Sequence, residues 1–348
     1  MTMSTKPHTT AKVAERAIAD MSAVVCTRDR TAQLERALDS LFKQELAPAE
    51  ILVVDNAPAD DSTRVLVERR FPDVRYVQEP VPGLDFARNR ALHESGQTVV
   101  AFLDDDVVAD CGWSRSMMTA FEKNPLAAAC IGRVEALTLE TEAQRLFEAN
   151  GGFSRGNERI CLPRDVTKPL HGRRAPLIAW AISVGSGCSL ALRREVALEI
   201  GGFDEALDLG TVLPGGGDLD MVWRILQAHH HVVYEPEALA WHEHRREMEK
   251  VFDQVVGHQR ALIAFVCKTT ACVRGTERLL VIAFLVWRLV KPGVRLLCRA
   301  TRRDPLPAWV ILRMWWHCWR GLGAYPAARR LARRRREENT VKAASRER

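Results

Sequence analysis

The sequence lacks the signals that assign a chain to export or to the interior of a membrane. Residues 1–20 (MTMSTKPHTTAKVAERAIAD) contain no apolar run of the kind that a secretory signal carries. The strongly apolar run at 279–290 is interrupted by Arg288, and it is too short because a membrane-spanning helix needs about 20 apolar residues. We therefore expect residues 1–20 to be a flexible leader on a cytoplasmic protein.

Several chemical motifs are absent as well. The chain has no G-x-x-x-x-G-K-[ST] loop, and the glycines at 215–217 do not follow a strand, as a dinucleotide fingerprint requires. This excludes a P-loop NTPase and a Rossmann dehydrogenase. The nine cysteines are scattered, and the closest pair, Cys267 and Cys272, lacks zinc-ligand spacing. We expect buried, reduced thiols, which suit a cytoplasmic protein.

Charge is distributed unevenly along the chain. The net charge is +6, but residues from 270 onward contain 19 Lys and Arg against 5 Asp and Glu, so the first 269 residues are net acidic. The basic character therefore belongs to the C-terminal part. An anionic surface, either a membrane or a nucleic acid, is the expected partner of such a segment.

The first half of the chain alternates buried strands with amphipathic helices. Strands are predicted at 21–30, 50–58, 74–80 and 98–107, and helices at 31–44, 62–71 and 84–96. Further on, the pattern predicts a glycine-containing strand, a helix and a Gly-Gly turn within 180–207, then a helix from Leu219 to about Ala228 and a strand at 232–236. This order predicts an α/β fold with a doubly wound, mixed, mostly parallel sheet.

Polar side chains gather where the predicted strands end. Thr27 and Arg28 follow the first strand, Asp55 ends the second, and Asp104, Asp105 and Asp106 end the run AFLDDD. Ligands bind at the carboxyl ends of the strands in such sheets. Three adjacent carboxylates with apolar flanks repel one another, so we expect a cationic partner to hold them. The alternative is a solvated acidic loop.

An ordered series of motifs resembles the family 2 glycosyltransferases, which have the GT-A fold. The resemblance covers roughly residues 21–245, and the order and spacing of its motifs make it specific. The motifs are VVCTRDR (24–30), VVDN (53–56), PGLDFARNRAL (82–92), FLDDDV (102–107), GGFDE (201–205), GGGDLDMVWR (215–224) and YEPEALAWHEH (234–244). The resemblance implies an inverting transfer of a sugar from a nucleoside-diphosphate sugar, UDP-linked in our interpretation, to an acceptor hydroxyl.

The resemblance also implies a divalent cation, Mn²⁺ or Mg²⁺. Asp106 would coordinate it, Asp104 would contact the ribose or the water shell of the metal, and His242 would complete the metal shell. Asp105 would point away or support the loop. Oxygen ligands suit both cations, and the cation neutralises the charge that develops on the departing diphosphate. A structural role is the alternative for His242.

Recognition of the nucleotide is expected from the strand ends. By resemblance, Asp55 accepts a hydrogen bond from the base, with Arg88 beside it, and Thr27 and Arg28 line the same pocket. A carboxylate that faces a ring N–H selects uracil or thymine. The alternatives are a helix cap for Asp55 and a surface ion pair for Arg88.

Asp218 is the predicted catalytic base, with Asp220 as the second candidate. The family carries acidic motifs at the start of a helix, where an Asp deprotonates the acceptor hydroxyl. This chain has Gly217 where the family frequently has Glu. Capping of the helix is the alternative for both residues. Pro214 and the three glycines after it predict a mobile loop.

Residues 251–348 are predicted to form a basic, Trp-rich helical extension with a disordered tail, next to a catalytic domain at 21–250. The segment 307–336 mixes four tryptophans with many arginines, which suits a helix in the interface of an anionic membrane. The alternative is an ordinary helical subdomain with a solvated tail. Peripheral attachment to the inner face of the plasma membrane would bring the enzyme to a saccharide or lipid-linked acceptor. We expect no nucleic-acid partner, because no reading motif accompanies the arginines.

Two rival functions remain open. A nucleotidyl or phosphoryl transferase would use the same acidic metal site, and a non-catalytic accessory protein would bind the nucleotide-sugar without turnover. The chain has no Q-x-x-R-W motif, so we expect addition of one sugar and not processive polymerisation.

Overall fold

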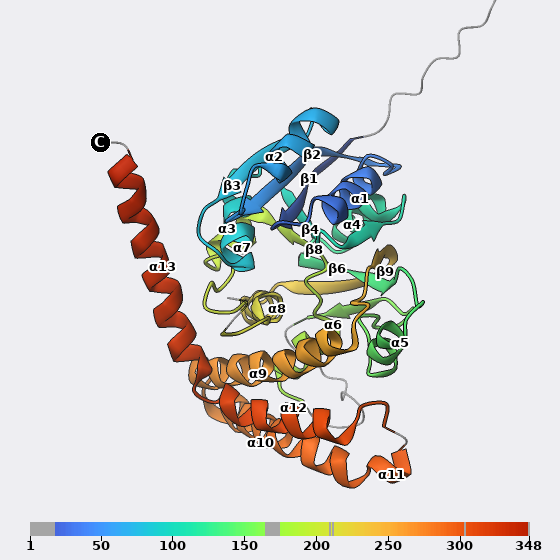
Figure 1. Ribbon diagram of the computed structural model, residues 1–348, viewed down its shortest axis with the longest axis vertical. Helices are drawn as coiled ribbons and strands as arrows, with labels where there is room; N and C mark the ends of the chain where they lie inside the picture. Colours follow the sequence, from blue (N-terminus) through green and yellow to red (C-terminus); the bar gives the residue numbers. More distant parts are fainter. Residues whose placement is uncertain (1–17, 164–174, 209, 211, 303, 347–348) are drawn as a thin grey trace, which may run out of the picture.

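The computed structural model describes residues 18–163, 175–208, 210, 212–302 and 304–346, and in this part a nine-stranded sheet lies above a layer of helices (Figure 1). The strands are β1 (Ile18–Thr27), β2 (Ala47–Asn56), β3 (Arg75–Glu79), β4 (Val99–Leu103), β5 (Val107–Ala109), β6 (Ala127–Ala136), β7 (Ile160–Leu162), β8 (Ser189–Arg193) and β9 (His231–His242). The helices up to the end of the sheet are α1 (Thr31–Leu41), α2 (Ser62–Arg70), α3 (Leu84–Glu94), α4 (Trp113–Lys123), α5 (Glu142–Ala149), α6 (Leu177–Val184), α7 (Arg194–Glu199) and α8 (Gly217–Gln227).

The sheet is mixed, and its parallel part carries the first strands of the chain. The strand order is β3-β2-β1-β4-β8-β6-β9-β5, with β7 paired to β9. Strands β1 to β4 pair in parallel, and so do β6 and β9, whereas β8 runs antiparallel to both of its neighbours. The parallel register places Thr27 beside Asp55. The predicted α/β class, the mixed sheet and the polar strand ends are thus confirmed.

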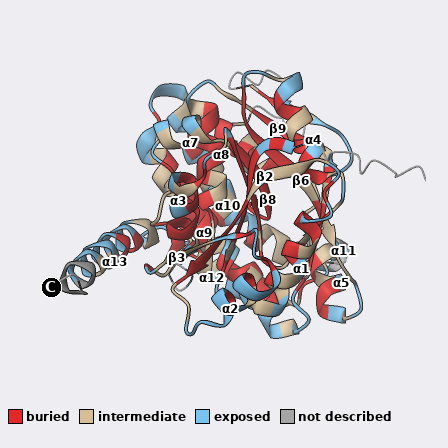
Figure 2. Cartoon of the chain, turned by 90° about the horizontal axis from the view of Figure 1, so that it is seen from above, coloured by how far each residue is buried: buried red, intermediate tan, exposed pale blue. Residues whose placement is uncertain are grey.

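The strands of the sheet are largely buried (Figure 2), and apolar side chains cover both of its faces. One core cluster joins the sheet to α3, α6 and α8, and a second joins it to α1 and α4. Side chains alternate between the two faces of a strand, so neighbours such as Val24 and Val25 contribute to different clusters. Burial on both faces explains why these strands read as continuous apolar runs.

The remaining helices form the lower layer of Figure 1. They are α9 (Met248–Cys272), α10 (Gly275–Leu297), α11 (Arg299–Arg302), α12 (Ala308–Gly321) and α13 (Ala324–Arg346). Helix α9 lies between the sheet domain and the pair α10 and α12, and its Leu262, Ala264 and Phe265 belong to the same core cluster as α8. Within the described ranges, none of the helices is both long and apolar enough to cross a membrane.

Several details differ from the sequence-based expectations. Residues 177–184, partly predicted as strand, form helix α6, because a short apolar run fits a buried helix as well as a strand. Strand β1 begins at Ile18, inside the predicted leader, whose residues 1–17 lie outside the described part. The nine cysteines are free, but Cys111, Cys161 and Cys272 are exposed, so the expectation of burial holds only for some of them.

The tail predicted to be disordered is helical up to Arg346, and residues 347–348 lie outside the description. Helix-forming Ala, Arg and Glu dominate it, and Arg333 pairs with Glu337 one turn away. Contacts with the sheet domain also stabilise it: the Tyr325 hydroxyl donates to Asp204 Oδ2 (2.7 Å) and Arg335 Nη1 donates to the Pro82 carbonyl (2.7 Å). The predicted boundary near residue 250 stays a prediction.

Candidate active site

A cavity of about 760 Å³ opens at the carboxyl ends of β1 and β4. Its other walls come from the start of α8 and from α9, which contributes Gln254, His258 and Leu262. Most of the predicted site residues line it. They are Thr27, Arg28, Arg88, Asp104, Asp106, Asp218 and His242. Asp55 and Asp220 are not among its lining residues.

The acidic cluster has a cationic partner, and it is arginine. Arg30 Nη1 lies 3.0 Å from Asp105 Oδ1 and 3.1 Å from Asp106 Oδ2, and the Thr27 hydroxyl donates to Asp105 Oδ2 (2.8 Å). Asp105 is buried, so it supports the loop, as expected. The acidic strand end is therefore an enclosed, paired structure and not a solvated loop.

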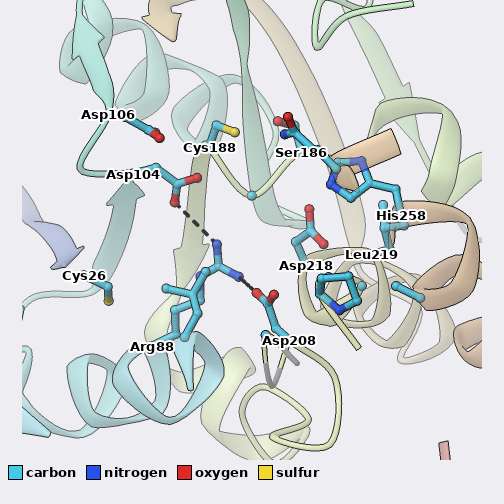
Figure 3. A pocket seen from close by; sticks show the side chains of 18 of the residues that line it. Cys26, Arg88, Asp104, Asp106, Ser186, Cys188, Asp208, Asp218, Leu219 and His258 are labelled. Atoms are coloured by element: carbon cyan, nitrogen blue, oxygen red, sulfur yellow. Dashed lines mark ion pairs between the residues drawn. The ribbon is translucent and has the colours of Figure 1, made fainter. Parts of the chain in front are cut away.

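Asp104 faces the cavity, with the Arg88 guanidinium beside it, as Figure 3 shows. Its Oδ1 lies 3.6 Å from Arg88 Nη2. Burial raises the pKa of Asp104 to about 7, although the Arg88 guanidinium opposes the shift. Near neutral pH this carboxyl group is therefore divided between its charged and neutral forms, and a nearby cation would favour the charged one.

His242 lies opposite Asp106. Its Nε2 is 3.5 Å from Asp106 Oδ1, and its Nδ1 is 2.8 Å from His244 Nδ1. Burial lowers the pKa of His242 to about 3, so the ring is neutral at ordinary pH, the form that ligates metals. In the part of the chain that the structure describes, no three His, Cys, Asp or Glu side chains are arranged as a complete protein metal site. A cation here would need substrate oxygens or water as further ligands.

Asp55 lies behind the cavity and not in its wall. The Tyr76 hydroxyl donates to Asp55 Oδ2 (2.8 Å), whereas the buried Oδ1 has no hydrogen-bond partner among the described residues. Burial raises the pKa of Asp55. The neighbouring Asn56 lines the cavity instead. The predicted role of Asp55 in binding a base stays a prediction, and Arg88 is a buried residue of another cluster, not a surface ion pair.

The two candidate bases have different surroundings. Asp218 lines the cavity from the first turn of α8, near His258 (Figure 3). Asp220 is fully buried and is held by Lys268 Nζ (2.6 Å) and Arg224 Nε (2.8 Å). Arg224 and Lys268 thus give Asp220 a structural ion-pair network, and of the two carboxylates Asp218 is the one that lines the cavity.

Sequence reasoning missed several lining or neighbouring residues. His258 comes from α9 and Arg335 from α13, helices that the sequence assigns to the extension. Nothing local in the sequence marks either residue, because their position depends on how the helices pack. Asp85 and Asp208, the buried partners of Arg88, are acidic residues inside or next to quoted motifs, so their charge was the available signal.

The mixed sheet, with an acidic loop at the end of the central strand β4 and a large cavity beside it, is an architecture of the GT-A type. The family model "Glycosyl transferase family 2" matches residues 22–201, more than half of the chain, and the chain belongs to that family.

Known relatives agree with this assignment. The chain is 26% identical over 231 residues to the "Pre-mycofactocin glycosyltransferase" of Mycobacterium tuberculosis, covering 66% of this chain but 44% of that one. It is 30% identical over 224 residues to the "Succinoglycan biosynthesis protein ExoM" of Rhizobium meliloti, covering 62% and 63% of the two chains. The chain thus spans only part of the length of these relatives.

A solved structure has the same fold. It is the "Mannosyltransferase PcManGT from Pyrobaculum calidifontis in complex with GDP-Man and Mn2+", which aligns with a TM-score of 0.54 at 16% identity. The alignment covers 89% of this chain and 86% of that one. This likeness concerns the fold alone.

Proposed function

We propose that the protein transfers one sugar from a nucleoside-diphosphate sugar to an acceptor hydroxyl, with inversion and with the help of a divalent cation. The observation that carries this proposal is the single cavity shared by Asp104, Asp106, His242 and Asp218. Two carboxylates and a neutral imidazole stand at the carboxyl end of the sheet, and a further carboxylate stands at the start of α8. The groups at the end of the sheet would bind the cation that activates the donor, and the carboxylate of α8 would deprotonate the acceptor.

Asp106, Asp104 and His242 would hold the cation. The donor set of two carboxylates and one neutral imidazole suits Mn²⁺ or Mg²⁺, which commonly complete their shells with phosphate oxygens. When bound, the cation neutralises the diphosphate leaving group. Arg30 pairs with Asp106 and Arg88 pairs with Asp104 in the structure. These ion pairs would stabilise the acidic loop at the end of β4 before the donor binds. The mannosyltransferase of similar fold is itself in complex with Mn²⁺ and GDP-Man, which supports the choice of a divalent cation.

Asp218 would act on the acceptor. Its carboxylate accepts the hydroxyl proton while the hydroxyl oxygen attacks the anomeric carbon, and the bond from that carbon to the diphosphate oxygen breaks. A single displacement by one base inverts the configuration. We propose a UDP-linked donor. Asp55 Oδ1 is a buried acceptor without a partner among the described residues, and it lies next to Asn56, which lines the cavity. Asp55 would have to turn into the cavity to accept a hydrogen bond from a ring N–H.

A turnover assay tests this function. The purified protein is incubated with UDP-glucose, UDP-galactose, GDP-mannose and dTDP-glucose in the presence of Mn²⁺, and the products are identified by mass spectrometry. Release of a nucleoside diphosphate from one donor supports the proposal. Release of pyrophosphate or a nucleotidylated product would favour a nucleotidyl transferase. Tight binding without turnover, with acceptors supplied, would favour an accessory protein.

We further propose that the helical extension attaches the enzyme to an anionic membrane, where a lipid-linked acceptor is found. Helices α10 and α12 pack against each other, and the Trp315 indole N–H donates to the Leu289 carbonyl (2.8 Å). Their outer helical face is strongly apolar. It consists of Leu279, Ile282, Val286, Trp287 and Val290 of α10 and Trp309, Leu312, Trp316 and Trp319 of α12, all exposed.

The charge around the outer helical face supports a lipid partner. Exposed cationic side chains border it, among them Lys291, Arg313 and Arg320. Indoles and cations together suit the headgroup region of an anionic bilayer. Helix α9 packs between the cavity, which it lines, and the pair α10 and α12, so the outer helical face belongs to the same helical layer that closes one side of the cavity. The sequence placed the membrane-binding segment at residues 307–336. The proposed surface includes α10 as well, whereas α13 lies apart from it (Figure 1).

A further inference from the structure

Asp85 and Gly217 fit each other closely at the edge of the cavity. Asp85 lies in the first turn of α3, and Gly217 is the first residue of α8. A Cβ atom at position 217 would lie 1.8 Å from Asp85 Oδ2 and 2.5 Å from its Cγ. The carboxyl group of Asp85 therefore fills the volume that any other side chain at 217 would need.

Asp85 is an acidic side chain that is buried without full pairing. Its side chain is 1% exposed, and Oδ2 has no hydrogen-bond partner among the described residues. A buried polar atom without a partner is destabilising, so such an atom needs a compensating role. Burial and the nearby Asp208 raise the pKa of Asp85, whereas the Arg88 guanidinium opposes this shift and favours the charged carboxylate. The other oxygen, Oδ1, lies 3.3 Å from Arg88 Nη1.

Arg88 connects Asp85 to the reacting parts of the cavity. Its Nη2 approaches Asp104, and its Nη1 also lies 3.7 Å from Asp208 Oδ2 (Figure 3). The guanidinium is 4% exposed and lies over the Phe203 ring, with 5.4 Å between Cζ and the ring centroid. Asp85 and Asp208 thus hold one edge of the guanidinium while the other faces Asp104.

Asp218 lies close to the same guanidinium. A Cβ atom at Gly187 would be 2.7 Å from Arg88 Nη2 and 3.2 Å from Asp218 Oδ2. Without its partners on the Nη1 edge, Arg88 would be free to turn toward Asp218 and neutralise it. A base paired with arginine is a poorer proton acceptor, because the pair favours its charged form.

We propose that Asp85 is a positioning residue for the glycosyl-transfer reaction. From α3 it supplies a carboxylate at the start of α8, which keeps Arg88 on Asp104 and leaves Asp218 unpaired. The inference rests on the proposed function of Asp218 and goes beyond it, because Asp85 is not among the residues that line the cavity. It also explains why position 217 carries glycine.

Exchange of the two side chains tests the proposal. Gly217→Ala should lower the thermal unfolding midpoint because of the clash, whereas Gly96→Ala, with open space at its Cβ, should not. Removal of the clash in D85G/G217A should recover most of the midpoint. D85G/G217D should return a carboxylate to the same volume, from α8 instead of α3.

Turnover separates positioning from packing. Asp85→Asn keeps the shape and removes the charge, so kcat should fall about 10- to 100-fold while KM for the donor changes little, as expected for a misplaced base. The donor is whichever of UDP-glucose, UDP-galactose, GDP-mannose or dTDP-glucose the wild-type protein consumes. The kcat of D85G/G217A should fall by a similar factor. The kcat of D85G/G217D should recover at least half of the lost logarithmic units, so that a 100-fold loss becomes a loss of at most about 10-fold.

Two results would overturn the inference. One is wild-type kcat in Asp85→Asn or in D85G/G217A, which would make the carboxylate dispensable. The other is an unchanged unfolding midpoint in Gly217→Ala, which would contradict the close fit. A wild-type protein that consumes none of the four donors would instead count against the proposed function, and the unfolding series would still decide whether Asp85 and Gly217 occupy one volume.

Discussion

Half-buried carboxylates paired with arginine line the cavity, whereas exposed indole and aliphatic side chains make up the outer helical face on α10 and α12. In the cavity, Asp104 and Asp106 are paired with Arg88 and Arg30 inside the fold. On the outer helical face, Trp316 is 63% exposed and Leu279 is 68% exposed. The cavity holds charged groups partly removed from water, whereas the outer helical face exposes apolar side chains to water. Both arrangements are unfavourable unless a ligand pairs with the charges or covers the apolar side chains.

The two regions should respond differently to substitution. A polar, enclosed site depends on single atoms, so an isosteric change should have a large effect there. An apolar face acts through its summed area, so single changes should have graded effects. The variants below should therefore act on one region and leave the other unchanged.

Asp218→Asn should give the largest effect. Loss of the base should lower turnover by about 10²- to 10⁴-fold, while nucleoside-diphosphate binding and vesicle binding stay close to wild type. Steady-state kinetics with calorimetry on the same sample measures both. Substantial turnover in this variant would remove Asp218 from its role, and the enclosed Asp220 would not replace it, because Arg224 and Lys268 already bind it.

Lys268→Ala should reduce stability more than catalysis. Its ammonium group lies 2.6 Å from both Asp204 and Asp220, and removal leaves a buried carboxylate short of a partner, at about 3 kcal/mol. Urea unfolding of this variant measures the loss. The matched control is Arg333→Ala on α13, whose pair with Glu337 is exposed and should not affect the unfolding midpoint. Equal effects of the two variants would contradict the structural role of Asp220.

Trp316→Asp and Trp319→Asp should weaken binding to vesicles. Each change should lower the affinity for phosphatidylglycerol vesicles roughly tenfold, equal to about 1.4 kcal/mol, without altering turnover on a soluble acceptor. Flotation of the full chain provides the measurement. Leu126→Asp is the control, because Leu126 is 61% exposed on the sheet domain, away from the outer helical face. Unchanged flotation of the double Trp variant would refute the membrane proposal.

A pH dependence should appear in the cavity and not on the outer helical face. The raised pKa of Asp104, about 7, means that protons compete with a cation below that value and cease to do so above it. Binding of a diphosphate with Mn²⁺ should therefore strengthen severalfold from pH 6 to pH 8. Asp104→Asn should flatten this profile. A wild-type profile that is flat, or that falls with rising pH, would contradict the proposed role of Asp104.

The sequence predicted the half of the cavity that strand ends build. Asp104, Asp106 and Thr27 follow apolar runs, so their position at the sheet edge is a local property of the chain. His242 was reached only through a family motif, and the structure places it opposite Asp106. The structure brings these residues together because strand ends in a parallel sheet meet at one edge, while their roles in binding stay predictions.

The other half of the cavity could not be predicted in this way. His258 and Arg335 depend on the packing of α9 and α13 against the sheet domain, which no local pattern specifies. The helical tail was missed because its charge suggested a solvated segment, while its anchor points, such as Tyr325 on Asp204, join residues far apart in the chain. Asp220, the second candidate base, lies away from the cavity wall that Asp218 joins, because two side chains at i and i+2 on a helix point in different directions.

Calorimetric titration of UDP, dTDP and GDP into the purified protein, with and without Mn²⁺, tests the central claim most directly. The account predicts binding of one diphosphate that requires Mn²⁺ and is lost in Asp106→Asn, while the exposed-site control Leu126→Asp binds as the wild type does. Absence of binding for all three diphosphates, or binding that ignores both the metal and Asp106, would contradict it.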